Sequence, residues 1–455
     1  MSFCSATPVA AFVRANLIAA AFLVAVSGCA SYHPKPLDPA MESAAFEARR
    51  LEPIPSGVFN LAALTEAATR FQPEVEVAAS RRRAAEAAVI TAGGHPNPTF
   101  SASAQKNRDA TPGTSPWTYG FGLDVPIETA GKRDHRVEQA FMRARAAALR
   151  EEDTRWLVRS RVREALLGVY PMEELSRRRL AIQQELTASL ERRLDAGLAS
   201  RPEVLQAHLA LSQATLALED AKRRRAEGMA RLAAAVGVPV RALDGVAFSF
   251  DDLAVPSRAD DPKADDVRRQ TLLARPDVLA ALADYDASQS ALRLEIARQY
   301  PDVSVGPGYM WDAGAIKWSL ALALALPVLN RNEGPIAEAE ARREEAAASF
   351  RAVQAKAIGE AEEAAAGYLH AARLLQTAER ILNDQRNHER SAQAAFRAGE
   401  SDRLSLLTAR LEAAAAETAR ADSMLEAWRA AGKLEDALRR PLAATEANPI
   451  HEDRP

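Results

Sequence analysis

Two halves of the chain carry the same landmarks in the same order, and this internal repeat constrains the fold more than any other feature of the sequence. Residues 64–100 align with residues 268–305, and residues 194–207 align with residues 396–409. The matching landmarks lie about 200 positions apart and are Pro73 with Pro276, Pro98 with Pro301, Gly197 with Gly399, and Leu205 with Leu407. One register held over so long a stretch predicts that a single set of helices and strands is built twice.

Each half is predicted to contain a helix, two strands, a long helix, a tight turn and a shorter helix. The expected helices span about 75–94, 132–195 and 203–236 in the first half, and about 278–298, 336–397 and 403–438 in the second. The expected strand hairpins span about 98–126 and about 301–327. Pro171 lies inside the first long helix and is expected to kink it.

The helix lengths predict a tall cylinder of antiparallel helices. Each long helix of about 60 residues would reach about 95 Å. A coiled-coil seam is expected in the second of them, because small and apolar side chains recur there at alternating spacings of three and four: Ile358, Ala361, Ala365, Tyr368, Ala372 and Leu375. The two shorter helices of each half would stack end to end beside a long one. Strands would then lie at one end of the cylinder and tight turns at the other.

The second strand of the second hairpin has an unusually regular alternation. Its first face is Ile316, Trp318, Leu320, Leu322, Leu324 and Leu326, and its second face is Lys317, Ser319, Ala321, Ala323 and Ala325. A period of two is typical of an extended strand. The pattern fits a half-buried strand of a soluble sheet, and it also fits a strand with lipid on one side and a lumen on the other.

The N-terminus is predicted to be a bacterial lipoprotein signal. Arg14 precedes about twelve apolar residues at 15–26, too few to span a bilayer. Residues 26–29 read VSGC, a small-residue cleavage pattern that makes Cys29 the new N-terminus and the site of lipid attachment. Ala30 is compatible with sorting to the outer membrane. The alternative is an ordinary signal peptide followed by a chance cysteine.

Composition and motifs exclude several classes of protein. The formal net charge is -3 and the sequence pI is about 6.3, so the chain lacks the excess of positive charge that is typical of nucleic-acid-binding proteins. Of its two cysteines, only Cys29 remains after the predicted signal peptide is removed, so no framework of disulfide bonds is expected. The seven histidines form no pair at i, i+4, and neither a phosphate-binding loop nor a nucleophile elbow is present. The sequence therefore predicts neither enzymatic activity, nor a cofactor, nor a metal site.

The strands predict an oligomer if they enter a membrane. Four strands of about ten residues have the length that crosses an outer membrane. Unpaired strand edges do not face lipid, so the sheet must close, and transmembrane barrels begin at about eight strands. Two protomers would give eight strands and three protomers would give twelve. The twelve-stranded barrel of three protomers is the one with a lumen wide enough for solutes. The alternative is a soluble sheet packed on the helices.

The chain resembles the TolC-type outer-membrane efflux channels over residues 61 to about 440. The resemblance rests on the two strand hairpins, on AGLASRPEVLQA and AGESDRLSLLTA at the turns, and on PVLNRNEGPIAEAEA after the second hairpin. Residues 124–136, DVPIETAGKRDHR, are similar to the branch serving heavy-metal and other cation efflux. The resemblance implies a mainly α-helical homotrimer, with a twelve-stranded barrel in the outer membrane and a helical tunnel in the periplasm.

The resemblance also implies partners and site residues. A periplasmic adaptor and an inner-membrane pump, usually of the resistance-nodulation-division type, would dock at the helix tips, which are Gly197 with Leu198 and Gly399 with Glu400. Family members carry acidic residues six and nine positions after the second tip glycine, where this chain departs with Ser405 and Thr408. The acids that remain as candidates for a pore constriction are Glu203, Glu400 and Asp402. Each is also explained as a carboxylate at a helix start.

These expectations divide the chain into six segments and leave three hypotheses for function. The segments are a signal peptide at 1–28, a tether at 29–60, a first repeat at 61–240, a linker at 241–266, a second repeat at 267–440 and a tail at 441–455. The leading hypothesis is a passive conduit for heavy-metal cations or drugs. The others are a lipid-anchored periplasmic coiled-coil scaffold and the outer-membrane channel of a protein secretion system.

Overall fold

The computed structural model describes residues 31–54, 57–109, 113–253 and 274–442. The predicted signal peptide, Cys29, the second half of the linker and most of the tail lie outside these residues. The chain divides into two units, Met1–Arg49 and Arg50–Pro455. In the first unit, helix α2 (Pro39–Ala48) begins after Asp38, whose carboxylate accepts a hydrogen bond of 2.8 Å from the backbone N–H of Ala40.

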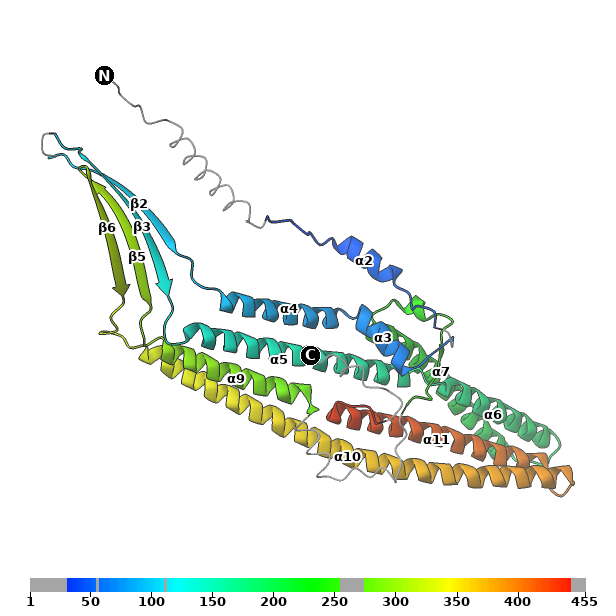
Figure 1. Cartoon of the computed structure of the whole chain (residues 1–455). Coiled ribbons are helices and arrows are strands. Elements are labelled where there is room, and N and C mark those ends of the chain that lie inside the picture. Colours follow the sequence, from blue (N-terminus) through cyan, green and yellow to red (C-terminus); the bar gives the residue numbers. More distant parts are fainter. Residues whose placement is uncertain (1–30, 55–56, 110–112, 254–273, 443–455) are drawn as a thin grey trace. The chain divides into compact units, whose positions relative to one another are not determined.

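The second unit is mainly helical, with one substantial sheet, as the sequence predicted (Figure 1). Its helices are α3 (Leu61–Phe71), α4 (Pro73–Gly93), α5 (Lys132–Leu167), α6 (Met172–Asp195), α7 (Arg201–Val236), α9 (Pro276–Ala297), α10 (Glu333–Arg397) and α11 (Arg403–Leu438), with a 3-10 turn at Val240–Leu243. The large sheet comprises β2 (Thr99–Lys106), β3 (Trp117–Ile127), β5 (Val303–Asp312) and β6 (Ala315–Leu324). The short strands β1 (Val58–Phe59) and β4 (Ala247–Phe248) form a parallel pair.

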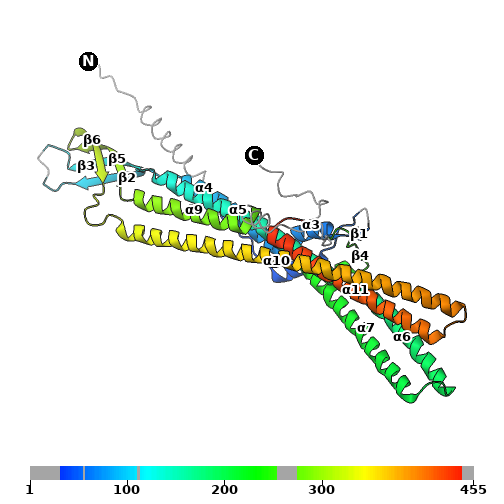
Figure 2. The same ribbon diagram turned by 90° about the horizontal axis from the view of Figure 1, so that it is seen from below.

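The helices of this unit pack side by side in two successive layers. Nearer the strands, α5 packs between α4 and α9, and α9 packs against α10. Farther from the strands, α6 packs between α7 and α11, and α11 packs against α10. Helix α10 has 65 residues and belongs to both layers (Figure 2). The guanidinium of Arg275, next to α9, donates to the backbone carbonyl of Ala437 in α11. Helices α9 and α11 therefore meet end to end beside α10, as their lengths predicted.

The first long helix differs from the prediction. A continuous helix over 132–195 with a kink was expected, but α5 ends at Leu167 and α6 begins at Met172. Pro171 has no N–H to donate and disfavours helical backbone in the residue before it, so the helix breaks. A second cause is the close approach of α7 to Gly168. A Cβ atom added to Gly228 of α7 would lie only 2.3 Å from the carbonyl oxygen of Gly168. The backbone of α7 thus passes directly over the break.

The sheet is antiparallel throughout and has the order β2-β3-β5-β6. Phe121 stands opposite Tyr309, and Tyr309 stands opposite Trp318, so the aromatic and leucine positions of the strands share one face. The other face carries small and polar residues, including Ser103 opposite Gly120 and Gly308 opposite Ser319. Strand β6 ends at Leu324, before the expected end of the hairpin near residue 327, because its partner β5 begins at Val303 and Pro327 has no N–H to extend the ladder.

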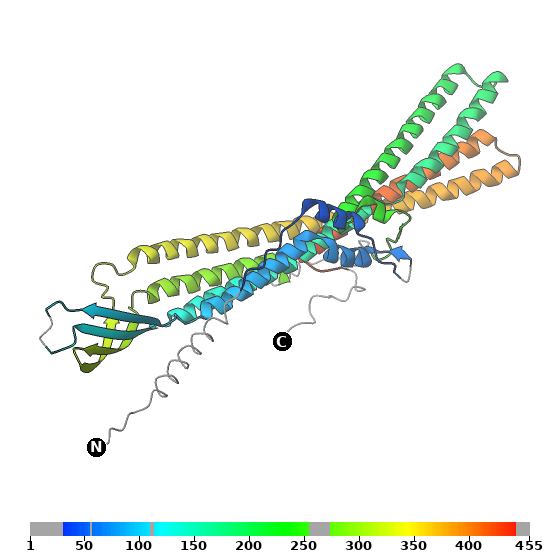
Figure 3. The same cartoon turned by 90° about the horizontal axis from the view of Figure 1, so that it is seen from above.

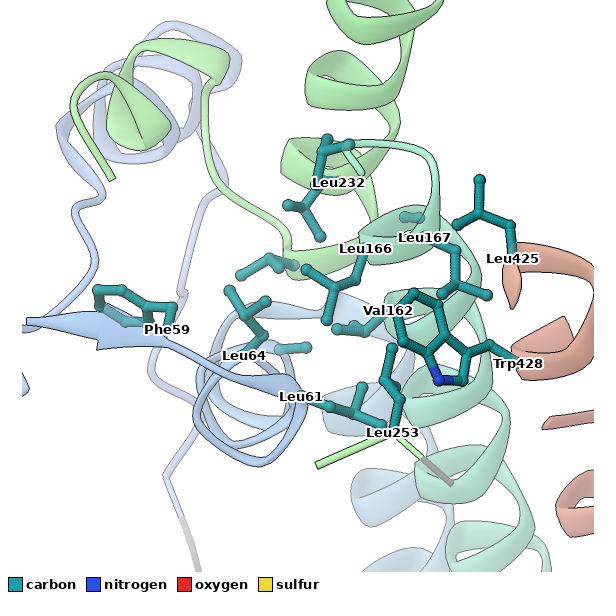
Figure 4. Packing of buried hydrophobic residues seen from close by; sticks show 14 of the residues in the cluster. Phe59, Leu61, Leu64, Val162, Leu166, Leu167, Leu232, Leu253, Leu425 and Trp428 are labelled. Atoms are coloured by element: carbon teal, nitrogen blue, oxygen red, sulfur yellow. The ribbon is translucent and has the colours of Figure 1, made fainter. Parts of the chain in front are cut away.

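The main hydrophobic core lies where the two helical layers meet. Figure 4 shows Leu61 and Leu64 of α3 packed with Val162 and Leu166 of α5, next to Leu232 of α7. Short helix α3 and the β1–β4 pair were not predicted, and they cover this core. Among the helices of the described residues, none is both long and apolar enough to cross a bilayer.

Candidate functional site at the helix tips

The turn between α6 and α7 is a glycine-terminated helix end. Gly197 has a φ of +73°, a left-handed conformation that glycine adopts without steric cost. The N–H of Leu198 donates to the carbonyl of Arg193 at 2.7 Å, and the N–H of Gly197 donates to that of Leu194 at 2.9 Å. This pair of bonds is the Schellman motif, which satisfies the last carbonyls of a helix. The exposed side chain of Leu198 projects from the tip.

The turn between α10 and α11 repeats that geometry. Gly399 has a φ of +76°. The N–H of Glu400 donates to the carbonyl of Ala395 at 2.8 Å, and the N–H of Gly399 donates to that of Phe396 at 3.1 Å. Both tips lie at the end of the helices away from the strands (Figure 3). The two predicted tip pairs therefore occupy equivalent backbone positions, with a leucine in one and a glutamate in the other.

Glu203 is bound within the start of its own helix. Its carboxylate accepts hydrogen bonds from the backbone N–H of Ser200 at 2.7 Å and from the Ser200 hydroxyl at 2.9 Å, and its own N–H donates to that hydroxyl. This capping box satisfies free N–H groups at the start of α7. The hydrogen bond from the Ser200 backbone is the main cause that lowers the pKa of Glu203.

Asp402 caps the start of α11. Its Oδ1 accepts hydrogen bonds from the backbone N–H of Ser405 at 2.9 Å and from the Ser405 hydroxyl at 2.7 Å. Its Oδ2 pairs with the guanidinium of Arg193 at 2.6 Å. The bonds from Ser405, followed by the one from Arg193, lower the pKa of Asp402 to about 2. Thr408 donates its hydroxyl to the carbonyl of Leu404, so both departures from the family pattern serve local hydrogen bonds.

Two ion pairs join the hairpins next to the tips. Arg193 near the end of α6 binds Asp402, and Arg403 at the start of α11 binds Glu185 in the middle of α6. Glu400 differs from the other candidate acids. Its exposed carboxylate forms no hydrogen bond or ion pair with another residue in the part of the chain that the structure describes. The structure thus places Asp402 and Glu400 in one turn. Of the three candidate acids, Glu400 is the one whose carboxylate has no partner among the described residues.

Sequence reasoning did not identify a second polar cluster, between the sheet and the helices. Lys132, at the start of α5 and 7% exposed, donates from Nζ to the carbonyl of Tyr300 at 2.6 Å and to Asp302 at 2.7 Å. Nearby, Arg136 binds Glu128 at 2.6 Å, and this contact lowers the pKa of that carboxyl. A usable signal was the run of basic residues at 132–136, shortly after the second strand-like segment. These ion pairs fix the base of β3 and β5 on the helices.

A buried network was also missed, in the middle of the helical layers. Glu435 is 4% exposed and accepts hydrogen bonds from Arg163 at 2.8 Å and from Arg159 at 2.9 Å. It also accepts one from the backbone N–H of Leu442. The two arginines lie about 270 positions before Glu435 in the chain, so no local pattern reveals these contacts. Within the described residues, no group of three or more His, Cys, Asp or Glu is arranged to hold a metal ion.

A protein-family model described as outer membrane efflux protein matches the chain over residues 64–238 and 267–438. The cobalt-zinc-cadmium resistance protein CzcC of Cupriavidus metallidurans is 26% identical over 291 residues, which make up 61% of this chain and 65% of CzcC. The match thus spans slightly less than two thirds of that relative.

Solved structures of outer-membrane channels have the same fold. The outer-membrane channel OprN superposes with a TM-score of 0.67 at 22% identity, over 90% of this chain and 98% of OprN. VceC of Vibrio cholerae gives 0.67 at 20% identity, over 84% of this chain and 97% of VceC. CusC gives 0.65 at 16% identity, over 90% of this chain and 99% of CusC.

Proposed function

The chain belongs to the outer membrane efflux protein family, and we propose that three copies of it form a passive conduit in the outer membrane of a tripartite efflux system. The family membership confirms the resemblance stated from the sequence motifs. The observation that carries the proposal is the open, one-sided sheet, whose apolar face is exposed and whose edge strands lack a second partner among the described residues. The remaining support comes from the helices and the tips.

The sheet supports closure by several protomers. Strand β2 forms one edge and β6 the other, and every strand between them is paired on both sides. An open edge is unfavourable in hydrocarbon because its N–H and C=O groups have no water to bind. Four strands are too few for a transmembrane barrel, so edges from different copies would pair. Three copies supply twelve strands and a lumen wide enough for solutes.

The helical layers support the same arrangement. Helix α10 forms one edge of both layers. The other edge is formed by α4 in the layer near the strands and by α7 in the layer near the tips. Helix α7 exposes an apolar stripe of Leu205, Leu209 and Leu216, which are 71%, 61% and 70% exposed. The stripe lies on the opposite side of α7 from the residues that pack on α6. Contact between α7 of one copy and α10 of the next would cover it and close a head-to-tail ring.

The tips support docking and a constriction. Gly197 with Leu198 and Gly399 with Glu400 would contact a periplasmic adaptor and the inner-membrane pump, which the family resemblance indicates to be of the resistance-nodulation-division type. Three copies of Glu400 at the entrance would present a ring of carboxylates to cations. Glu203 and Asp402 are engaged by their own helix starts, so Glu400 is the best of the three candidates for the constriction.

Substrate and anchoring are the finer parts of the proposal. Similarity to CzcC, a protein named for cobalt, zinc and cadmium resistance, supports heavy-metal cations as the substrate class ahead of drugs. Energy and most of the substrate selection would reside in the pump. We also propose that Cys29 is acylated after signal-peptide cleavage, which would anchor the N-terminus in the outer membrane.

The test is a paired measurement on cells and on the isolated protein. An efflux conduit predicts a detergent-extracted, heat-modifiable trimer in the outer-membrane fraction, and a deletion strain more sensitive to divalent metals or to dyes. A trimer with unchanged sensitivity to both classes contradicts efflux and leaves protein secretion. A protomer that leaves the membrane without detergent contradicts the conduit and leaves the lipid-anchored scaffold.

A further inference from the structure

Each strand in the second half of the large sheet has a counterpart in the first half. Strand β5 corresponds to β2 in the alignment that matches Pro98 with Pro301. Strand β6 corresponds to β3 in the alignment that matches Trp117 with Trp318. The repeat therefore assigns to every residue of one hairpin a definite counterpart in the other.

The pairing inside the two hairpins follows this correspondence. Phe100 stands opposite Leu123 in the first hairpin, and their counterparts, Val303 and Leu324, stand opposite each other in the second. The agreement holds at every pair of β2 from Phe100 to Lys106. The two hairpins therefore share one register, and the repeat is a reliable guide to strand pairing in this chain.

The contact between the two halves joins β3 to β5 in the middle of the sheet. Val125 stands opposite Val305 there, and Ile127 stands opposite Val303. In a closed ring of head-to-tail copies, such a contact alternates with one from the second half of a copy to the first half of the next. The contact inside one chain therefore supplies a template for the contact of β6 with β2 of the next copy.

We propose that β6 of one copy pairs with β2 of the next copy in the register that β3 takes with β5. Counterparts of the template residues place Leu326 opposite Ala102 of the next copy, and Val328 opposite Phe100 of the next copy. This inference rests on the proposed function, because it presupposes that several copies share one sheet. It adds which residues of the two edges meet.

Residues 325–328 supply the part of β6 that this contact needs. They lie beyond the ladder with β5, which ends at Leu324. The apolar alternation continues through them, and Leu326 and Val328 are 70% and 75% exposed. The N–H of Val328 donates to the carbonyl of Leu326 at 2.9 Å, a local turn that pairing with β2 would replace. Their counterparts at 124–127 lie inside β3, so the proposed contact gives both segments a strand partner.

Pro327 is compatible with this extension of β6. Its counterpart, Pro126, lies inside β3 opposite Ser304 of β5, at a position where the ladder with β2 has already ended at Asp124. Proline is accepted at such a position because no second neighbouring strand requires its missing N–H. In the proposed register Pro327 stands opposite Ser101 of the next copy, likewise beyond the end of the ladder with β5.

Two equivalent leucines near the tips extend the argument to the helices. Leu407 of α11 is 1% exposed, and it lies one helical turn after Arg403, which pairs with Glu185 of α6. Its counterpart in α7, Leu205, is 71% exposed. Helix α11 packs on both α6 and α10, whereas α7 packs on α6 near the tips. A repeat of the α6–α11 contact by α10 and the α7 of the next copy would bury Leu205 as Leu407 is buried.

The tilt of the strands distinguishes the proposed register from its neighbours. Repeating the template around a ring shifts the strands by about eight residues per copy, which corresponds to a tilt of about 55°. Tilts of about 35° and about 45° correspond to shifts of about four and six residues. Ser103 meets Ala325 of the neighbouring copy in the proposed register, but Ala321 or Ala323 in these alternatives. The repeat favours Ala325, because the same shift per strand already separates β2 from β5 within one chain.

Cysteine pairs on the small-residue face of the sheet test the register directly. Ser103→Cys would be combined in one chain with Ala325→Cys, Ala323→Cys or Ala321→Cys. Each protein would be oxidised in isolated outer membranes and sized under denaturing conditions without reductant. All of these substitutions replace a small side chain by one of similar size. Neighbouring registers differ by about 6.8 Å along a strand, which leaves a mismatched pair too far apart to form a disulfide.

Two control variants make each result interpretable. Ser304→Cys with Ala323→Cys is the positive control, because these residues stand opposite each other within one sheet, and its oxidation is read by the loss of free thiol. Ser103→Cys alone reports any link to Cys29. The heat-modifiable oligomer band verifies the assembly of every variant before oxidation.

Each outcome bears on a different part of the account. The proposal predicts intermolecular links in the Ala325→Cys pair and only background linking in the other two pairs. Strongest linking in the Ala323→Cys or the Ala321→Cys pair overturns the register and leaves the shared wall in place. Absence of intermolecular links in all three pairs, with the positive control oxidised, overturns the shared sheet and the proposed function with it.

Discussion

Arg193 near the end of α6 and Asp402 at the start of α11 form an ion pair of 2.6 Å that ties the two helical hairpins together beside their tips. The same carboxylate caps α11 through the N–H and hydroxyl of Ser405. One side chain therefore starts a helix and holds it against the neighbouring hairpin. These two roles can be separated by substitution.

Asp402→Asn is expected to keep the helix start and lose the tie. Asparagine caps helices about as well as aspartate, but it has no charge to pair with Arg193. Asp402→Ala removes both, and loss of an N-cap costs about 1 kcal/mol. Amide hydrogen exchange in the first turn of α11 should therefore rise in Asp402→Ala but not in Asp402→Asn. Spin labels at Ala196 and Ala398 should report separated tips in both variants. Faster exchange in Asp402→Asn contradicts the division of roles.

The tie between the hairpins should depend on pH in a defined window. The pKa of Asp402 in the folded protein is about 2, below its usual value of 3.8. A depressed pKa means that the stabilising contribution is complete above the usual value and is lost as the pH falls toward 2. The distance between the same spin labels should stay constant from neutral pH to about 4 and increase below it. Asp402→Asn should show none of this component, and an identical pH profile in that variant rules out Asp402 as its source.

Glu400→Gln should reduce the preference of the channel for cations. Glu400 is the candidate acid that has no partner among the described residues, so its charge is available to ions at the entrance. The ratio of cation to anion permeability, measured across a planar bilayer, should fall in this variant. Glu203→Gln is the control, because that carboxylate is bound by Ser200 within α7. A fall caused by Glu203→Gln alone would move the constriction to the first hairpin.

Gly228→Ala should destabilise the protein at the break between α5 and α6. The added Cβ would lie 2.3 Å from the carbonyl oxygen of Gly168, and backbone on both sides leaves no flexible group to move. Overpacking of this kind costs about 1–3 kcal/mol. Gly359→Ala in α10 is the matched control, since an added Cβ meets nothing within 4 Å there. Thermal unfolding of the oligomer in detergent should show a lower midpoint for the first variant and no decrease for the second.

Local patterns predicted most of the elements. The helix expected at 403–438 is present as α11, and the alternation over residues 316–326 predicted the apolar face of β6. Pro171 predicted a kink in the first long helix but not that α5 would stop at Leu167, because the cause includes the approach of Gly228 from another helix. The contacts of Glu435 with Arg159 and Arg163 depend on packing between distant segments, which one sequence does not encode locally. At the tips, the turn glycines could be predicted from the sequence. That the carboxylates of Glu203 and Asp402 are occupied within their own helix starts could be seen only from their hydrogen-bond partners in the structure.

The most direct test of the central claim is cysteine cross-linking between the two edge strands of the sheet. Single cysteines would be scanned along β2 and along β6 in one chain, oxidised in the outer membrane, and the linked products sized under denaturing conditions. A wall shared by three protomers predicts intermolecular β2–β6 links at one register and a ladder of products that ends at three copies. The absence of any intermolecular link along both strands, or a ladder that continues beyond three, would contradict it.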